Sequence, residues 1–147
     1  MITIRKAAFS DAAAVAALAL QLWPDHEVRE MQIEFESILT AAEAAIFLAF
    51  VDETPVGFAQ CQLRHDYVEG TSSSPVGYLE GIFVMPAYQK RGIARILLSS
   101  CESWAKEQGC TEFASDCELC NTDSLHFHLR VGFEEANRII CFTKTLS

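Results

Sequence analysis

The stretch Tyr88-Gln89-Lys90-Arg91-Gly92-Ile93-Ala94 decides the fold of this chain. It follows an apolar run from Tyr78 to Met85, closed by Pro86, and precedes an amphipathic segment from Ala94 to Gln108. A strand, a basic turn and a helix start form a cradle for an anion, because the first backbone N–H groups of a helix lack partners and the helix dipole favours negative charge. Gly92 would let a phosphate approach the backbone closely. A basic turn that only caps an ordinary helix is the alternative.

The length and hydropathy of the chain suit a single domain over residues 1–147. Half of the residues are hydrophobic, which is enough to fill one core. No uncharged apolar run reaches the length of a membrane span, so no membrane partner is expected. The N-terminus, Met1-Ile2-Thr3-Ile4-Arg5, lacks the long apolar core of a signal peptide. We therefore expect a cytoplasmic protein.

The formal net charge of −9 argues against nucleic acid as a partner, because nucleic-acid phosphates attract Lys and Arg. An acidic chain fits a cationic partner, which an acidic cleft would concentrate and steer. Plain solubility accounts for the same charge, so the charge alone does not choose between these interpretations.

The six cysteines, at positions 61, 101, 110, 117, 120 and 141, are expected to be free thiols because no export signal is present. Cys117 and Cys120, followed by His126 and His128, imitate a zinc signature. The two histidines lie two residues apart on an expected helix and therefore do not face the same way. We expect no metal, and structural zinc is the alternative.

Hydrophobic periodicity and turn residues divide the chain into elements in the order β-α-α-β-β-β-α-β-α-β. The first helix is expected to start at Ser10 or Asp11 as its N-cap and to end at Trp23-Pro24. This order predicts a mixed α/β fold with a splayed central sheet flanked by helices, rather than a doubly wound sheet. Strands are expected over residues 1–6, 45–51, 56–63, 76–85, 111–115 and 139–145, and helices over 11–22, 30–42, 94–108 and 123–130.

Glu80 stands inside an apolar strand, where an unpaired buried carboxylate is costly. A strand that runs past a cleft accounts for it, and an edge position in water is the alternative. Gly81 permits a bulge, which would free the N–H of Ile82 or Phe83 to polarise a thioester carbonyl. Asp116 follows the strand at 111–115 and would either point into the same cleft or cap a turn. Two carboxylates beside one cleft can hold a polycation.

The spacing Gln89-x-x-Gly92-x-Ala94 resembles the pyrophosphate loop of the GNAT superfamily of acyl-CoA N-acyltransferases. The order of the elements is similar to the GNAT order from the first strand to the last. Asn121 and the helix end Val131-Gly132-Phe133 resemble its second motif. The resemblance implies a GNAT fold and acetyl-CoA as co-substrate. It implies these cofactor-binding residues: Ile82, Phe83, Val84, Gln89, Lys90, Arg91, Gly92, Ile93, Ala94, Arg95 and Asn121.

His128 departs from the family pattern. Many GNAT proteins carry at this position a Tyr that protonates the departing thiolate. His128 can donate a proton near neutral pH, and a packing role is the alternative.

A narrower resemblance rests on Leu22-Trp23-Pro24, on residues 64–70 (RHDYVEG), 73–84 (SSPVGYLEGIFV) and 112–116 (EFASD), and on 132–135 (GFEE). These stretches are similar to the chromosomal branch of bacterial aminoglycoside 6'-N-acetyltransferases. The resemblance implies that Trp23, Tyr67, Glu80 and Asp116 line the acceptor site, with aromatic walls for a sugar ring and carboxylates for its ammonium groups. Core packing is the alternative for both aromatic residues. The resemblance also implies a homodimer formed through C-terminal strands.

The combined prediction is an acetyl-CoA-dependent N-acetyltransferase of the 6'-amine of aminoglycosides, with direct transfer in a ternary complex. Glu80 or Asp116 would accept the proton of the amine. No cysteine has an obvious His partner that would make it a nucleophile. Two alternatives stay open: an acetyltransferase for another amine, such as a polyamine or a peptide N-terminus, and a CoA-binding sensor without catalysis.

Overall fold

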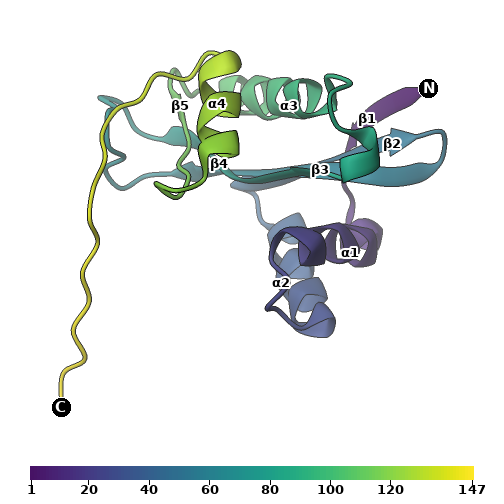
Figure 1. The fold of residues 1–147 in the computed structure, drawn as a ribbon, viewed down its shortest axis with the longest axis horizontal. Helices are drawn as coiled ribbons and strands as arrows, with labels where there is room; N and C mark the ends of the chain where they lie inside the picture. The colour runs from purple at the N-terminus through teal and green to yellow at the C-terminus, as the bar shows by residue number, and fades with distance from the viewer.

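A five-stranded sheet with helices on both faces forms the body of the protein (Figure 1). The computed structural model describes all residues 1–147. Strands β1 to β4 pair antiparallel in sequence order, and β5 pairs parallel to β4. The predicted mixed α/β class is confirmed. The elements are β1 (Ile2–Lys6), η1 (Phe9–Asp11), α1 (Ala12–Leu22), α2 (Val28–Thr40), β2 (Ala44–Val51), β3 (Thr54–Arg64), β4 (Val76–Val84), η2 (Pro86–Tyr88), α3 (Ile93–Glu107), β5 (Phe113–Ala114) and α4 (Thr122–Arg130).

Each face of the sheet carries its own hydrophobic core, because successive residues of a strand point to opposite sides. Ala45 and Ala49 of β2 belong to the core that α3 covers, whereas Ile46 and Leu48 belong to the core that α1 and α2 cover. Figure 1 shows α1 and α2 on one side of the sheet and α3 and α4 on the other. No helix is both long and apolar enough to cross a bilayer.

All predicted elements except the last are present within two residues of their expected bounds. Helix α2 starts earlier than expected because the Glu27 carboxylate accepts hydrogen bonds from the N–H groups of Arg29 and Glu30, both at 3.1 Å. Met31 and Phe35 form its inner face and are buried against α1 and the sheet.

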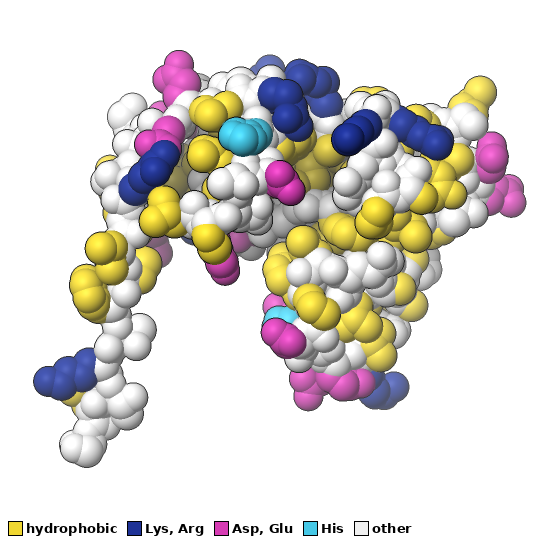
Figure 2. Space-filling view, viewed as in Figure 1, with side chains coloured by type: hydrophobic (Ala, Val, Ile, Leu, Met, Phe, Trp, Pro, Cys, Tyr) yellow, Lys and Arg dark blue, Asp and Glu magenta, His cyan; other side chains and the backbone are white.

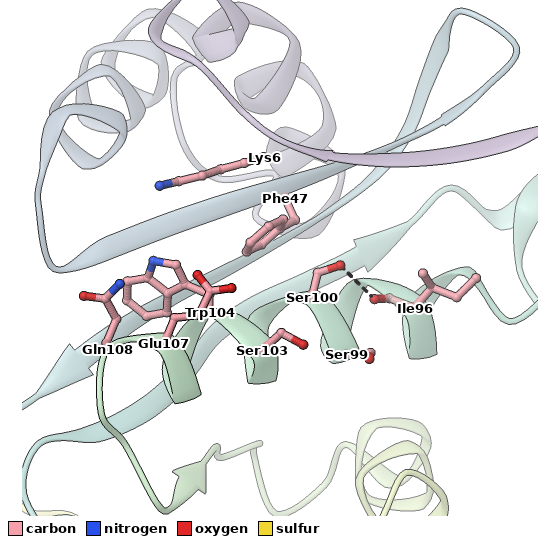
Figure 3. Close-up of a pocket in the computed structure, with 9 residues that line it drawn as sticks. All are labelled: Lys6, Phe47, Ile96, Ser99, Ser100, Ser103, Trp104, Glu107 and Gln108. Atoms are coloured by element: carbon pink, nitrogen blue, oxygen red, sulfur yellow. Dashed lines mark hydrogen bonds between the residues drawn. The ribbon is translucent and has the colours of Figure 1, made fainter.

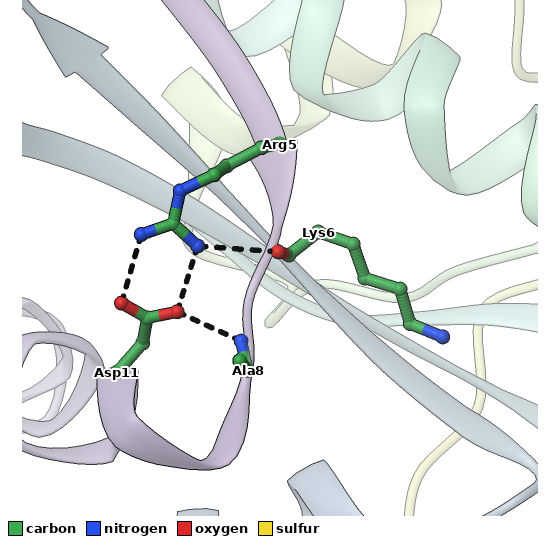
Figure 4. Close-up of polar contacts among 4 residues, drawn as sticks. All are labelled: Arg5, Lys6, Ala8 and Asp11. Carbon is green, nitrogen blue, oxygen red and sulfur yellow. Dashed lines mark hydrogen bonds and ion pairs between the residues drawn. The ribbon is translucent and has the colours of Figure 1, made fainter.

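Asp11 joins the end of β1 to the start of α1 (Figure 4). Its carboxylate accepts two hydrogen bonds from the Arg5 guanidinium, at 2.7 and 2.9 Å, and one from the Ala8 N–H at 2.7 Å. The hydrogen bonds from Arg5 are the main reason that the pKa of Asp11 lies below its usual value. Asp11 therefore occupies the predicted N-cap position, but its carboxylate binds the preceding turn instead of the helix N–H groups.

A β-bulge at Glu80 interrupts the pairing of β3 with β4. Gly81 pairs with Gln60 and Leu79 pairs with Cys61, which leaves Glu80 without an opposite residue. The bulge shifts the alternation of side chains, so Leu79 packs into the core under α3 while Gly81 faces the α1 side. The bulge predicted from Gly81 is therefore present.

Strands β4 and β5 separate soon after they meet. Their parallel pairing covers only Gly77 with Phe113 and Tyr78 with Ala114. From Leu79 to Val84, β4 pairs with β3 alone, so its other edge carries backbone groups without a strand partner. This is the splayed sheet that the sequence predicted.

The strand predicted over residues 139–145 is wrong for the single chain. Residues 134–147 form neither helix nor strand and run away from the body (Figure 1). A strand exists only where another strand satisfies its backbone groups, and the tail has no such neighbour. Its base is anchored, because the Asn137 amide donates to the Glu69 carboxylate at 3.0 Å and Ala136 lies against Gly70.

Candidate active site

The turn between β4 and α3 has the backbone shape of an anion-binding concavity. Lys90 and Gly92 have positive φ angles, 64° and 80°, on either side of Arg91, and such alternation points successive N–H groups toward one side. Gly92 is the N-cap of the 15-residue helix α3, and no side chain caps that end. A Cβ on Gly92 would meet nothing within 4 Å. The left-handed backbone favours glycine here, and the space in front of it is open.

The predicted strand segment Ile82 to Val84 ends beside this turn. The Gln89 side-chain amide donates to the Val84 carbonyl at 2.9 Å, which ties the turn to the strand. Ile93 is buried and Ala94 is half-buried in the core under α3. These two residues can therefore offer only backbone groups at the turn.

Three cationic side chains surround the start of α3. Lys90, Arg91 and Arg95 are all exposed. Arg91 lies 5.4 Å from the centre of the Tyr88 ring, which steadies its guanidinium. Figure 2 shows Lys and Arg side chains gathered over the region of α3. This concentration of positive charge on an acidic chain suits a phosphate-bearing ligand.

Glu80 is ion-paired, which neither of the two interpretations from sequence anticipated. The Arg64 guanidinium donates from Nε to Oε2 at 3.0 Å and from Nη2 to Oε1 at 2.8 Å. The side chains of Glu80 and Arg64 are 18% and 38% exposed, so the pair is partly withdrawn from water. The hydrogen bonds to Glu80 raise the pKa of Arg64. The two parallel bonds fix the plane of the carboxylate.

Tyr78 links this ion pair to Asp116. The Arg64 guanidinium carbon lies 3.4 Å from the centre of the Tyr78 ring, and the Tyr78 hydroxyl donates to the Asp116 carboxylate. Burial and the hydrogen bond to Asp116 raise the pKa of Tyr78. The structure thus brings the two predicted carboxylates into one cluster with Arg64 and Tyr78, which we call the acceptor cluster.

The two predicted aromatic walls differ in their surroundings. Trp23, at the end of α1, lies so close to Gly81 that a Cβ there would come within 2.7 Å of the indole ring. Trp23 also packs edge-on against Phe58, with ring centres 6.3 Å apart. Trp23 is therefore part of the core and also lies next to the bulge. Tyr67 lies in the loop between β3 and β4 and is 76% exposed, which excludes core packing.

His128 has a hydrogen-bond partner for each ring nitrogen. Nδ1 lies 2.7 Å from the Ser124 carbonyl, and Nε2 lies 2.7 Å from the Ser115 hydroxyl. A carbonyl only accepts, so Nδ1 carries a proton, and the neutral ring accepts at Nε2 from Ser115. Only the imidazolium form can donate from Nε2 toward Ser115. His128 therefore bridges α4 to the end of β5.

Asn121 caps helix α4. Its side-chain oxygen accepts from the Ser124 N–H at 3.1 Å, as expected of an N-cap residue. Its amide nitrogen remains able to donate, which is the part of the side chain that a pantetheine carbonyl would need.

Sequence reasoning missed Arg64 and Tyr78. The signal that points to them is the register of the hairpin, in which Arg64 lies opposite Val76, two residues from Tyr78. Diagonal neighbours on antiparallel strands lie within reach of a long side chain.

A shallow surface pocket of about 430 Å³ lies elsewhere, over α3 and β2 (Figure 3). No residue that the sequence predicted for the donor or acceptor site lines it. The lining residues are Lys6, Phe47, Ile96, Ser99, Ser100, Ser103, Trp104, Glu107 and Gln108.

The cysteines are free, and Cys117 and Cys120 are exposed. No group of three or more His, Cys, Asp or Glu side chains is placed to hold a metal ion.

Comparison with known proteins places the chain in a family. Residues 12–133 match the acetyltransferase (GNAT) family. The chain is 46% identical to an aminoglycoside N(6')-acetyltransferase type 1 of Stenotrophomonas maltophilia, with 98% of this chain and 94% of the relative covered. It is 44% identical to the protein of the same name from Salmonella typhimurium, with 86% and 88% covered.

A solved structure agrees over the whole length. AAC(6')-Iy in complex with the bisubstrate analogue CoA-S-monomethyl-acetylneamine has a TM-score of 0.95 and 40% identity, with 99% of each chain covered. Aminoglycoside antibiotic 6'-N-acetyltransferase AAC(6')-Ih from Acinetobacter baumannii has a TM-score of 0.93 and 39% identity over both complete chains. This protein therefore belongs to the acetyltransferase (GNAT) family.

Proposed function

We propose that the protein is an acetyl-CoA-dependent N-acetyltransferase of the 6'-amino group of aminoglycosides. Relatives that are 46% and 44% identical to this chain are aminoglycoside N(6')-acetyltransferases. In this chain the proposal rests on the acceptor cluster. There Arg64 and Tyr78 connect Glu80 to Asp116, beside Trp23. Carboxylates and an aromatic ring are the groups that an aminocyclitol or amino sugar needs.

The turn before α3 fits the pyrophosphate of CoA. Its backbone N–H groups, the uncapped start of α3 and the exposed side chains of Lys90, Arg91 and Arg95 are complementary to a dianion. Bound acetyl-CoA supplies a thioester-activated acetyl group. The open edge of β4 from Ile82 to Val84 leads from this turn toward Glu80, so donor and acceptor sites meet on one strand.

The acceptor amine arrives as an ammonium ion and must lose a proton before it attacks. Glu80 or Asp116 accepts that proton, directly or through a water molecule. Trp23 and Tyr67 hold the sugar ring, and the backbone N–H near Ile82 stabilises the oxyanion as the amine adds. His128, in its imidazolium form, donates toward the departing thiolate by way of the Ser115 hydroxyl. The amine attacks the acetyl carbon itself, so the transfer is direct.

A pair of acceptors that differ only at the 6' position tests this function. We expect an aminoglycoside with a 6'-amine to release free CoA thiol in the presence of acetyl-CoA, and its 6'-hydroxyl counterpart to release almost none. Spermidine and a peptide N-terminus serve as competing amine classes. Faster turnover of either one would replace the aminoglycoside assignment, and tight CoA binding without turnover of any amine would favour a sensor.

We further propose a homodimer in which the tail, residues 134–147, adds to the sheet of a second copy. The tail carries four exposed apolar residues, Ile139, Ile140, Phe142 and Leu146, each at least 70% exposed in the single chain. Figure 2 shows hydrophobic side chains along the tail where it leaves the body. Large apolar side chains in this arrangement mark an interface, and β5 offers an edge for strand addition.

Sedimentation measures this assembly directly. We expect the full chain to sediment as a dimer and a chain ending at Arg138 to sediment as a monomer. A matched variant, with Ile139, Ile140 and Phe142 all changed to Ser, keeps the length and should also be monomeric. A full chain that is monomeric at micromolar concentration would contradict the dimer.

A further inference from the structure

Arg64 lies at the centre of the acceptor cluster and has no part in the mechanism above. It donates two hydrogen bonds to Glu80 and stacks on Tyr78, whose hydroxyl donates to Asp116. Each of the two carboxylates that the reaction uses is therefore held by a neighbour in the same cluster. The two neighbours are themselves in contact, so the four side chains form one continuous unit.

We propose that Arg64 is a positioning residue for acetyl transfer, which holds Glu80 in the orientation that accepts the proton of the acceptor amine. This inference rests on the proposed function. The bulge leaves Glu80 without an opposite residue to restrain it, and a glutamate side chain has several rotamers to choose from. The guanidinium of Arg64 selects one of these rotamers, because it binds both carboxylate oxygens at once.

Arg64 orients the Glu80 carboxylate and leaves part of its hydrogen-bonding capacity free. Each carboxylate oxygen has two lone-pair sites, and Arg64 occupies one site on each oxygen. The remaining sites stay available to an ammonium group. Tyr78 in turn supports the guanidinium of Arg64, whose central carbon lies 3.4 Å from the centre of the ring.

Arg64 also sets the charge of the site. Two carboxylates and one guanidinium leave the acceptor cluster with one net negative charge. The two carboxylates favour acceptors that bring several ammonium groups, because one group can meet Asp116 while another meets the free lone pairs of Glu80. An acceptor with one amine satisfies only one of these positions.

The test compares Arg64→Met and Arg64→Lys with Arg5→Met. Arg5 makes the same kind of contacts far from the site, a bidentate pair with Asp11 and a stack on Phe50 at 4.8 Å, so Arg5→Met reports the cost of losing a stacked ion pair alone. For a 6'-amino aminoglycoside, we expect Arg64→Met to lower kcat about tenfold, equivalent to ~1.4 kcal/mol, and to change KM less than about threefold. Arg64→Lys should recover only part of kcat, since lysine restores the charge without the fork. Arg5→Met should keep wild-type kcat and KM.

A double-mutant cycle separates positioning from a general structural effect. If Arg64 acts through Glu80, Arg64→Met should lower kcat no further in a Glu80→Gln background. Wild-type kcat in Arg64→Met, or an equal loss in both backgrounds, would overturn the inference. Calorimetric CoA binding and the melting temperature show whether each variant is folded. Failure of the wild type to acetylate any aminoglycoside would refute the proposed function, and the cycle would then be measured with the amine that the enzyme does accept.

Discussion

The proposed donor side and the proposed acceptor side of this protein are built in opposite ways. The donor side is local: the end of β4, the turn at residues 89–92 and the start of α3 follow one another in the chain. The acceptor side combines Trp23 from α1, Arg64 from β3, Glu80 from β4 and Asp116 from beyond β5. The first depends on backbone conformation, and the second depends on side chains that must pair correctly across the fold.

This difference predicts different responses to mutation. A substitution at the donor turn should act through backbone geometry and sterics, with little dependence on distant residues. A substitution in the acceptor cluster should propagate to its partners, because removing one charge leaves another unpaired. The two sides consist of different residues, so changes on one side should leave binding on the other almost intact.

The largest effect is expected at the donor turn. Gly92→Asp should abolish CoA binding, because it places a side chain and a negative charge in the open space where the pyrophosphate would lie. Gly109→Asp is a matched control, since Gly109 also has a positive φ, 93°, and open surroundings, but lies at the far end of α3. Calorimetry should show wild-type CoA affinity for Gly109→Asp only. Equal losses in both variants would show that backbone strain, rather than the cradle, is responsible.

The next effect concerns the acceptor cluster. Glu80→Ala and Asp116→Ala should each lower kcat/KM for aminoglycosides about tenfold or more, equivalent to ~1.4 kcal/mol, because each removes a carboxylate that would pair with an ammonium group of the acceptor. Glu80→Ala should be the more severe, since it leaves the half-buried Arg64 unpaired. Glu107→Ala removes the same charge at the distant pocket and should leave kcat/KM unchanged. Loss of CoA affinity in the cluster variants would refute the separation of the two sides.

A smaller effect is expected at His128, between the two sides. His128→Phe should lower kcat several-fold and leave both substrates bound, since general acid catalysis contributes to the chemical step rather than to binding. Ser115→Ala should lower kcat similarly if the proton passes through that hydroxyl. Unchanged kcat in His128→Phe across the pH range would leave His128 with only its bridging role.

The smallest effect on catalysis is expected outside both sides, at Asp11. The pKa of Asp11 is lowered in the folded protein, chiefly by hydrogen bonds from Arg5, so its stabilisation is present above the unfolded pKa and is lost as pH falls through the folded pKa. Asp11→Asn should lower the free energy of unfolding by about 1 kcal/mol at pH 7, allowing for the exposure of Arg5. The difference in the free energy of unfolding between Asp11→Asn and the wild type should become smaller below about pH 4.

Asp52→Asn provides the control for this measurement. Asp52 pairs with the N-terminal amine at 3.2 Å, but both groups are more than four-fifths exposed, so little change is expected at any pH. Urea unfolding at pH 7 and pH 3 measures both variants. If Asp11→Asn lost more unfolding free energy at pH 3 than at pH 7, the carboxylate of Asp11 would not be the stabilising form. Both variants should keep wild-type kinetics.

Periodicity and turn chemistry predicted nine of the elements because those segments bury their apolar faces within the chain. The last strand failed for the converse reason. Residues 139–145 have the apolar character of a strand, but a strand also needs a partner edge, and in the single chain the tail pairs with none. A local sequence pattern predicts that a segment tends to be extended, whereas the pairing of that segment with another strand depends on the assembled sheet.

The sequence alone determined the donor turn, since glycine spacing, a preceding apolar strand and a following amphipathic helix fix the backbone there. It also singled out Glu80 and Asp116 as unusual carboxylates. Only the tertiary structure decided how those carboxylates are held. Tyr78 and Glu80 lie two residues apart on β4, and Arg64 of the neighbouring strand β3 contacts both of them. Gly81 indicated the bulge, but which side chain of β3 meets Glu80 depends on the register of the two paired strands, and no local pattern in the sequence records that register.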